Sequence, residues 1–225
     1  MGKDFRGTAL LVDYIDFGRG LSLAAGSVAG SGPRLRLVGG LSLAETGLVI
    51  DSGGATITGA FAAGTTLSRG TGVDTANTFY DTAVFTMGSM IVTQIIVDLT
   101  DLVSSTTDLD IVGEDDVANC SWGQITTAVN GVIIGGKMTC LEAPAGGQTD
   151  IDIYSATVST GTEDAAITAL VETALISSGG AWTSGRTLGM TLLPPADDYI
   201  YFVVGAAGTA AAYTAGKFLI ELYGT

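Results

Sequence analysis

Histidine is absent from this chain of 225 residues, and basic side chains are scarce, with nine lysines and arginines against 23 aspartates and glutamates. The missing imidazole removes the commonest general base and transition-metal ligand of proteins. The shortage of basic residues argues against nucleic acid and anionic membranes as partners, since both require a basic surface. The net charge of −14 instead favours solubility at high local concentration.

Several motifs of enzymes and metal sites are missing as well. The sequence has no glycine-rich dinucleotide loop, no Walker A lysine and no Gly-x-Ser-x-Gly nucleophile elbow. Cys120 and Cys140 do not form a Cys-x-x-Cys pair, so zinc would have to recruit carboxylates. Hydrolysis by two carboxylates needs no histidine, but the spacing of the acids singles out no pair. We therefore predict a protein that is not an enzyme and has no cofactor or metal.

No segment is typical of a membrane span or a secretory signal. The longest weakly polar run, residues 200–213, is short and contains two glycines, so we expect a buried strand followed by a loop of small residues. Near the N-terminus, Asp13 and Asp16 interrupt the apolar stretch that a signal peptide would need. We expect synthesis in a cytoplasm.

Charge is distributed unevenly along the chain. From residue 1 to 75 six basic residues balance six acidic ones, whereas from residue 76 to 225 three basic residues face seventeen acidic ones. A neutral part joined to an acidic body is typical of a building block that docks by one part and exposes the other. We therefore divide the chain into residues 1–75, a glycine-rich strand-forming arm or small β-domain, and residues 76–225, an acidic β-sandwich domain.

Short strand-length segments bounded by glycine fill the first part, and Gly-Leu-Ser-Leu-Ala occurs twice. Segments so short and one-sided require a partner surface, on a neighbouring domain, a symmetry-related copy or another protein. The alternative is one more sheet of the same domain. Residues 59–77, rich in small residues, are predicted to connect the two parts. The segments are residues 20–24, 34–38, 40–44, 47–51 and 55–58.

The body is predicted to contain about eight short strands, because β-branched and aromatic residues cluster in runs bounded by turn residues. Many short strands with a single helix indicate an all-β fold, a β-sandwich of jelly-roll-like type. The predicted strands are residues 84–86, 91–99, 121–129, 132–140, 150–154, 186–192, 199–204 and 217–223.

Asn130-Gly131 is the strongest hairpin signal, and its loop length decides how the two cysteines are placed. A three-residue loop puts Cys120 directly across from Cys140, whereas a two-residue loop puts the sulfurs on opposite faces. Because we expect cytoplasmic synthesis, we predict two buried thiols, with a disulfide as the alternative.

One helix is predicted over residues 163–177. Acids at positions 163 and 164 suit the N-terminal end of a helix, and a glycine pair at 179 and 180 supplies the stop. A single apolar stripe at helical spacing is formed by Ile167, Leu170, Val171, Ala174 and Leu175.

Two acidic groups and five aromatic residues allow functional alternatives. The run 108–116 is predicted to be a solvated loop, with a calcium site as the alternative, although its spacing is not that of an EF-hand. Asp150 and Asp152 share one face of a predicted strand, where a metal site is the alternative. The aromatic residues are predicted to lie in the core or in a subunit interface, with a sugar-binding surface as the alternative. They are Trp122, Trp182, Tyr199, Tyr201 and Tyr213.

Two strings of the body carry a family resemblance. Residues 140–147 read Cys-Leu-Glu-Ala-Pro-Ala-Gly-Gly, and residues 213–220 read Tyr-Thr-Ala-Gly-Lys-Phe-Leu-Ile. With residues 118–125 and 150–154, they make the chain similar to a family of uncharacterised virion proteins of tailed bacteriophages, particularly marine ones. The resemblance covers roughly residue 79 to the C-terminus and brings no assigned chemistry. It implies a structural protein of the virion.

Capsid decoration is the role that best fits the size, the charge and the missing catalytic groups. Such a cement protein binds the outside of a shell of major capsid protein, here as an expected homotrimer, and stabilises it through many small contacts. A neutral, strand-forming arm suits addition to the edge of a neighbour's sheet. The predicted docking residues are Leu21, Leu23, Arg34, Leu35, Arg36, Leu37, Leu41, Leu43 and Leu48.

The roles of these docking residues have an alternative, and so does the function. The arginines are expected to contact carboxylates of the shell, while the leucines either dock or fill the protein's own core. A trimeric head or tail fibre that binds host glycan would use the repeats as a shaft and the aromatic residues as its binding surface. A carboxylate-based glycosidase would need a cleft that holds two acids.

Overall fold

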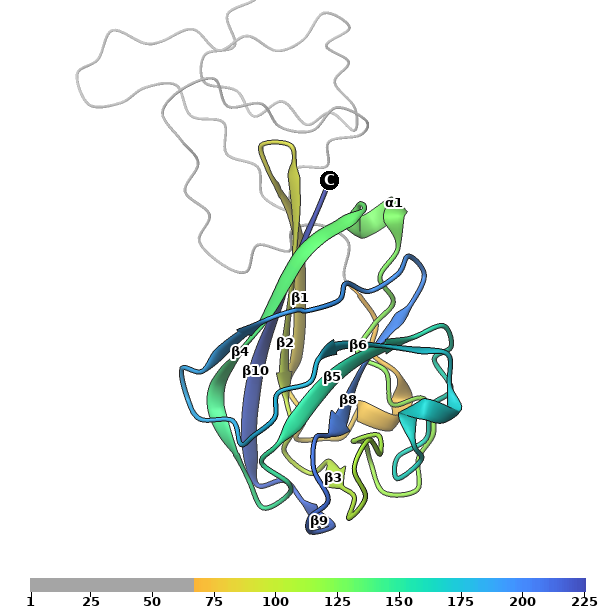
Figure 1. Cartoon of the computed structure of the whole chain (residues 1–225), viewed down its shortest axis with the longest axis vertical. Coiled ribbons are helices and arrows are strands. Elements are labelled where there is room, and N and C mark those ends of the chain that lie inside the picture. Colours follow the sequence, from red (N-terminus) through yellow and green to blue (C-terminus); the bar gives the residue numbers. More distant parts are fainter. Residues whose placement is uncertain (1–66) are drawn as a thin grey trace, which may run out of the picture. The chain divides into compact units, whose positions relative to one another are not determined.

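The computed structural model describes residues 67–225, which form a body of antiparallel strands (Figure 1). The predicted strand segments and docking residues between positions 20 and 58 lie outside the described residues. Helical structure in residues 67–225 is limited to single turns, namely η1 (Thr71–Val73), α1 (Thr127–Asn130) and η2 (Ile167–Ala169). No helix among residues 67–225 is long and apolar enough to cross a membrane.

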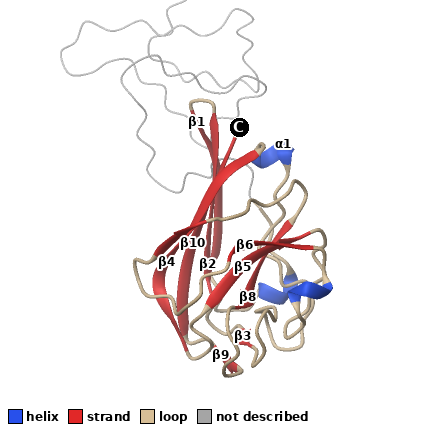
Figure 2. Cartoon of the chain, in the orientation of Figure 1, coloured by secondary structure: helices blue, strands red, loops and turns tan. Residues whose placement is uncertain are grey.

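The strands form three antiparallel sheets (Figure 2). The largest has the order β1-β2-β10-β4-β7, the second β6-β5-β8, and β3 pairs with β9 alone. This arrangement confirms the prediction of an all-β sandwich, whereas the jelly-roll connection pattern stays a prediction. The strand bounds are β1 (Tyr80–Met87), β2 (Met90–Asp98), β3 (Val103–Ser104), β4 (Ile133–Ala145), β5 (Ile151–Ala156), β6 (Glu172–Ile176), β7 (Thr187–Gly189), β8 (Tyr199–Val204), β9 (Ala211–Ala212) and β10 (Ala215–Gly224).

The five-stranded sheet follows the alternation of its sequence. In β10, even-numbered residues from 216 to 224 are buried and odd-numbered ones are half-buried, so one face meets the core and the other faces outward. β1 and β2 form a hairpin whose tight turn contains Gly88 at φ +65°, a conformation that favours glycine. The register places Phe218 opposite Val97 on the core side and Tyr223 opposite Val92 on the outer side.

Aromatic rings join the two main sheets. Phe218 of β10 lies with its ring centroid 5.5 Å from that of Phe202 on β8 and 5.4 Å from that of Trp182, both in edge-to-face geometry. Phe202 in turn lies 5.6 Å from Trp122. All four side chains are buried, so this cluster is the centre of the sandwich core.

The predicted helix over residues 163–177 is wrong. Asp164 has φ +60°, which breaks any helix at its start, and only the single turn η2 follows. The later part of the segment is strand β6, paired with β5 through Tyr154 opposite Ala174. The residues of the predicted apolar stripe do not share one face: Leu175 is buried in the core, while Val171 is 72% exposed. Pairing with a buried neighbouring strand overrides the local helical spacing.

The predicted hairpin at Asn130-Gly131 is also wrong, and residues 121–129 do not form a strand. Asn130 ends the one-turn helix α1, and Gly131 with φ +71° closes it. β4 pairs with β10 and β7, so Cys140 lies opposite Phe218. Cys120 lies in the loop before α1. Both cysteines are buried and unbonded, which confirms the predicted thiols.

The first described segment is fastened to the body at several points. Leu67 donates its backbone N–H to Oγ1 of Thr82 at 3.0 Å. Further along, the N–H of Gly70 donates to the carbonyl of Ser121 at 2.7 Å, and the N–H of Gly72 donates to the carbonyl of Asn119 at 3.1 Å. A Cβ at Gly70 would collide with the carbonyl oxygen of Asn119, so this approach requires glycine.

Candidate functional site

The nine predicted docking residues, from Leu21 to Leu48, lie outside the described residues. The remaining candidates are in the body: an acidic cluster, a pair of aspartates around the first residue of β5, the aromatic residues, and the two faces of the large sheet.

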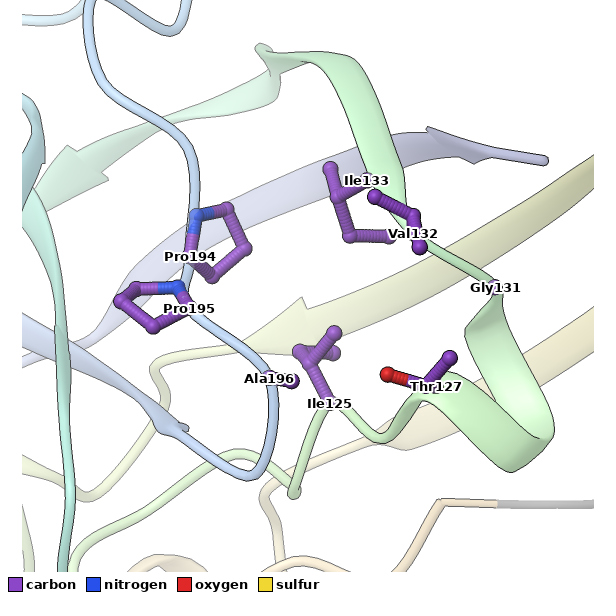
Figure 3. A pocket seen from close by; sticks show the side chains of 8 residues that line it. All are labelled: Ile125, Thr127, Gly131, Val132, Ile133, Pro194, Pro195 and Ala196. Carbon is purple, nitrogen blue, oxygen red and sulfur yellow. The ribbon is translucent and has the colours of Figure 1, made fainter.

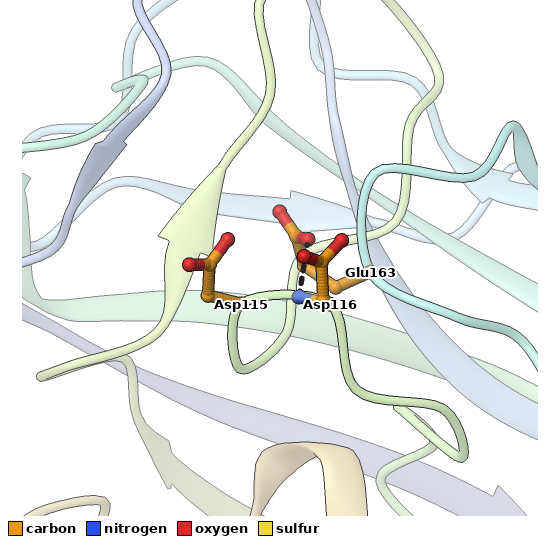
Figure 4. A group of neighbouring side chains, drawn as sticks. All are labelled: Asp115, Asp116 and Glu163. Atoms are coloured by element: carbon orange, nitrogen blue, oxygen red, sulfur yellow. Dashed lines mark hydrogen bonds between the residues drawn. The ribbon is translucent and has the colours of Figure 1, made fainter.

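An acidic cluster forms where the loop after β3 meets the segment before η2 (Figure 4). Carboxylate oxygens of Asp115, Asp116 and Glu163 all lie within 4.8 Å of one another. Asp115 and Asp116 are exposed, as the prediction of a solvated loop requires. Glu163 is only 6% exposed and accepts the backbone N–H of Asp116 at 3.2 Å. Burial, together with the neighbouring acids, raises the pKa of Glu163 above its usual range.

Within the acidic run, Asp110 departs from the prediction of a solvated loop. Its side chain is buried and accepts the hydroxyl of Ser105 at 2.6 Å. Its backbone forms a bridge with Ala166. Part of the run is therefore fixed to the core while its tip faces solvent.

Asp150 and Asp152 lie side by side at the start of β5 and share one partner. The backbone N–H of Ser178 donates to Oδ1 of Asp152 at 2.5 Å, and the hydroxyl of Ser178 donates to Oδ1 of Asp150. Burial raises the pKa of Asp152, although the hydrogen bonds oppose this effect. These hydrogen bonds connect the segment after β6 to the beginning of β5, so the two aspartates have a structural role.

The aromatic residues do not form a sugar-binding surface. Trp122, Trp182, Tyr201 and Tyr213 are at most 2% exposed, and Tyr199 is half-buried. The hydroxyl of Tyr201 donates to the carbonyl of Val158 at 2.7 Å. These positions confirm the prediction of core residues.

Cys120 is an inert thiol rather than a reactive one. Its Sγ donates to the carbonyl of Val117 at 3.1 Å, and burial raises its pKa to about 12. A thiol with such a pKa holds almost no thiolate at neutral pH and is a weak nucleophile. Gly72 and Gly113 pack so closely that a Cβ at either position would collide with this sulfur.

The outer face of the five-stranded sheet is charged over the half near the β2 C-terminus. Lys217 contacts Glu142 at 2.6 Å and Asp98 at 3.2 Å. Further along β10, Glu221 contacts Lys137 of β4 at 2.8 Å. These ion pairs raise the pKa of both lysines, since the carboxylates stabilise the ammonium form. Two of the four basic residues of the described body are used here.

The other half of this sheet ends in exposed apolar side chains. Phe85 and Met87 of the hairpin β1–β2 are 41% and 61% exposed, and Val132 and Ile134 at the start of β4 are 60% and 57% exposed. We call this surface, formed by Phe85, Met87, Val132 and Ile134, the apolar end. Exposed apolar side chains gathered at one place mark interaction surfaces more often than scattered ones do.

A shallow pocket of about 190 Å³ adjoins the apolar end (Figure 3). It lies between the α1 segment and the loop that carries Pro194 and Pro195. Ile125, Val132 and Ile133 also line it. With no charged side chain in its wall, the pocket extends the apolar surface rather than offering a catalytic cleft.

The apolar end was not identified from the sequence, although a signal for it exists. Residues 82–97 and 117–136 contain no charged side chain, and neither do residues 187–196. In a chain with net charge −14, uncharged runs of this length point to buried or docked surface. The sequence alone does not reveal that three such runs meet at one end of a sheet.

Comparisons of the chain with protein-family models, with curated proteins and with solved structures find no match.

Proposed function

We propose that this chain is a non-enzymatic structural protein of a bacteriophage virion that binds the outside of the capsid shell and stabilises it. The expected partners are the major capsid protein, through the neutral N-terminal part, and other copies of the chain. The sequence resemblance described above suggests the virion, and the distribution of charge suggests the role within it.

One observation carries the proposal: all of the net charge of −14 resides in residues 67–225, while residues 1–66 are neutral and rich in alternating leucine and serine or arginine. A decoration protein needs a neutral part that contacts a shell and a body that keeps crowded copies apart in solvent. Acidic bodies repel one another at low salt, and this repulsion is screened within about 4 Å at the ionic strength of seawater. Avidity over a lattice then makes weak individual contacts sufficient.

The fibre alternative receives less support from the body. Its binding surface was to be built from aromatic residues, but four of the five are buried in the sandwich core. A glycan-binding role would need another surface.

Cryo-electron microscopy of virions tests the proposal directly. We expect density for the sandwich in a regular array over the shell, with residues before 67 in contact with capsid subunits. Density confined to a tail or a single spike would contradict decoration and favour the fibre.

A binding assay on shells that lack the protein tests the docking residues. The double variant Arg34→Glu/Arg36→Glu is expected to lose shell binding, because it reverses both charges that are assigned to capsid carboxylates. The matched control Lys3→Glu/Arg6→Glu makes the same change of charge in the same neutral segment and is expected to bind. Equal binding by both variants would remove the two arginines from the docking site.

A further inference from the structure

Asn130-Gly131 is a motif that the proposed function does not use. Asn130 is the only asparagine of the chain that glycine follows. Such a pair reacts in water by itself, because the glycine has no side chain to keep its backbone nitrogen away from the asparagine. That nitrogen attacks the amide carbon Cγ, ammonia leaves, and a five-membered imide closes. Water then opens the imide at either carbonyl and gives aspartate or isoaspartate.

The fold keeps both reacting groups occupied. Nδ2 of Asn130 donates to Oγ1 of Thr93 at 2.8 Å, and Oδ1 accepts the backbone N–H of Thr126 at 2.9 Å. The N–H of Gly131 donates to the carbonyl of Thr127 at 3.1 Å. Asn130 is fully buried, so water does not reach its amide carbon in the closed fold. The reaction therefore requires that these hydrogen bonds break and that water enters.

The element that holds these groups is a small one. α1 is four residues long, and a single helical turn is not stable without contacts to the rest of the fold. Thr127 and Ala128 are exposed, so the contacts of the turn come mainly from Asn130 and from the two backbone hydrogen bonds that Val132 exchanges with Thr225. Opening such a segment requires less free energy than unfolding the whole sandwich.

We propose that Asn130 is a site of spontaneous deamidation, and that local opening of α1 rather than unfolding of the whole body sets its rate. The step consumes one water and releases one ammonia, so it needs no oxidant, metal or enzyme. Hydroxide takes the proton of the Gly131 nitrogen before the attack. This inference concerns the chemistry of the body and does not depend on the proposed function.

Either product prevents the turn from closing again. Aspartate would bury a carboxylate beside Thr93 at a position with no exposure, which is costly without a counter-charge. Isoaspartate adds a carbon to the main chain where Gly224 packs so closely that a Cβ would collide with the carbonyl oxygen of Asn130. A copy that has reacted therefore keeps a loosened junction between the start of β4 and the end of β10.

Peptide mass spectrometry of the full chain tests the proposal. The chain is incubated at mildly alkaline pH, folded or unfolded in urea, and the aspartate and isoaspartate products at position 130 are followed over time. We expect the folded chain to react at least about 30-fold more slowly, because reaction requires an open state of small population. Equal rates in the two states would overturn the proposal.

A matched pair of variants separates local opening from global unfolding. Thr93→Val removes the hydroxyl that accepts from Asn130 and should raise the rate in the folded chain by about 10-fold. Thr82→Val makes the same change on β1, where the hydroxyl accepts the N–H of Leu67, and should leave the rate within about twofold of the parent. Equal acceleration by both variants, or by neither, would contradict the proposal. Thr93→Ser keeps the acceptor and should react like the parent.

Hydrogen exchange supplies a second measurement that does not depend on the chemical step. The N–H of Gly131 is expected to exchange faster than that of fully buried Ile95 in the core of β2, and Thr93→Val should accelerate exchange at Gly131 alone. Exchange at Gly131 as slow as at Ile95 would show that α1 opens only when the whole body unfolds, and would overturn the proposal.

Discussion

Two groups of apolar side chains on the same five-stranded sheet differ in their burial. On the core face, Phe218 is fully buried against Trp182 and Phe202 of the opposing layer. At the apolar end, Phe85 and Met87 lie on the outer face of β1, opposite Val92 and Met90, and are 41% and 61% exposed. Burial within the fold stabilises the first group, whereas the second group stays exposed in the described residues, as side chains of interaction surfaces do.

The two regions also differ in what surrounds them. The β3–β9 side of the body carries acidic loops with Asp110 buried and Asp115 and Asp116 exposed, so it mixes structural and solvated charge. The apolar end has neither. The acidic loops and the apolar end are therefore separate surfaces of the body, with different chemical character.

The largest expected effect is in the core. Phe218→Ala removes a ring that touches aromatic partners from two segments and should lower the free energy of unfolding by about 3–5 kcal/mol. Urea denaturation followed by tryptophan fluorescence measures this loss, because Trp182 reports on the same contact. A loss below about 1 kcal/mol would mean that Phe218 is not central to the core.

The second largest loss of stability is expected at Asn130, which lies buried next to the apolar end. Asn130→Ala deletes two buried hydrogen bonds and should cost about 1–3 kcal/mol. Thr93→Ala removes the partner of one of them, so the two changes together should cost less than the sum of the single losses. Strict additivity in this double-mutant cycle would show that the Asn130–Thr93 contact does not stabilise the fold.

A change at Glu163, in the acidic cluster, is expected to have a smaller effect, and to raise the free energy of unfolding rather than lower it. Burial raises the pKa of Glu163, so the folded state holds a proton at pH values where the unfolded state has lost it. The contribution of Glu163 to stability is therefore greatest below its unfolded pKa and is lost as pH rises through the raised folded value. Glu163→Gln removes the charge but keeps an acceptor for the N–H of Asp116.

For Glu163→Gln we expect a gain of up to about 1 kcal/mol in the free energy of unfolding at pH 7, and a shallower decline in melting temperature as pH rises above the ordinary pKa of glutamate. Thermal melts across this range measure both. Glu114→Gln neutralises an exposed neighbour and serves as the control, with little change expected. Destabilisation by Glu163→Gln at pH 7 would show that the ionised carboxylate stabilises the folded state.

The smallest effect is expected at the apolar end. Met87 is 61% exposed, so Met87→Asp removes few contacts within the fold. Unfolding of dilute protein should therefore change by no more than about 0.5 kcal/mol. A loss as large as that of Phe218→Ala would erase the distinction between the two regions, since it would make Met87 part of the core.

Strands in the body were predictable where alternation and β-branched residues coincide. The predicted strand 199–204 matches β8 in full, and the predictions at 91–99 and 217–223 overlap β2 and β10 closely. These segments pair with two neighbours or lie against the core, so local pattern and tertiary context agree.

The two failures have physical causes that the sequence does not display. Asn-Gly occurs both in hairpin turns and at helix ends, because each needs a residue with positive φ, and Gly131 serves the second use. Ile167 and Leu175 fit a helical stripe, but Ile167 lies in the single turn η2 and Leu175 lies in β6, which pairs with β5. The apolar end was missed for a similar reason, since its residues come from runs that only the sheet register brings together.

The backbone hydrogen bonds of Leu67, Gly70 and Gly72 have a mechanical consequence. A tensile load arriving from the preceding residues enters the body at hydrogen bonds to two separate segments, strand β1 at Thr82 and the loop at Asn119 and Ser121. The force is thus shared between β1, which is an edge strand of the large sheet, and the loop that leads to α1. Such a load would therefore act on two parts of the body at once, rather than on β1 alone.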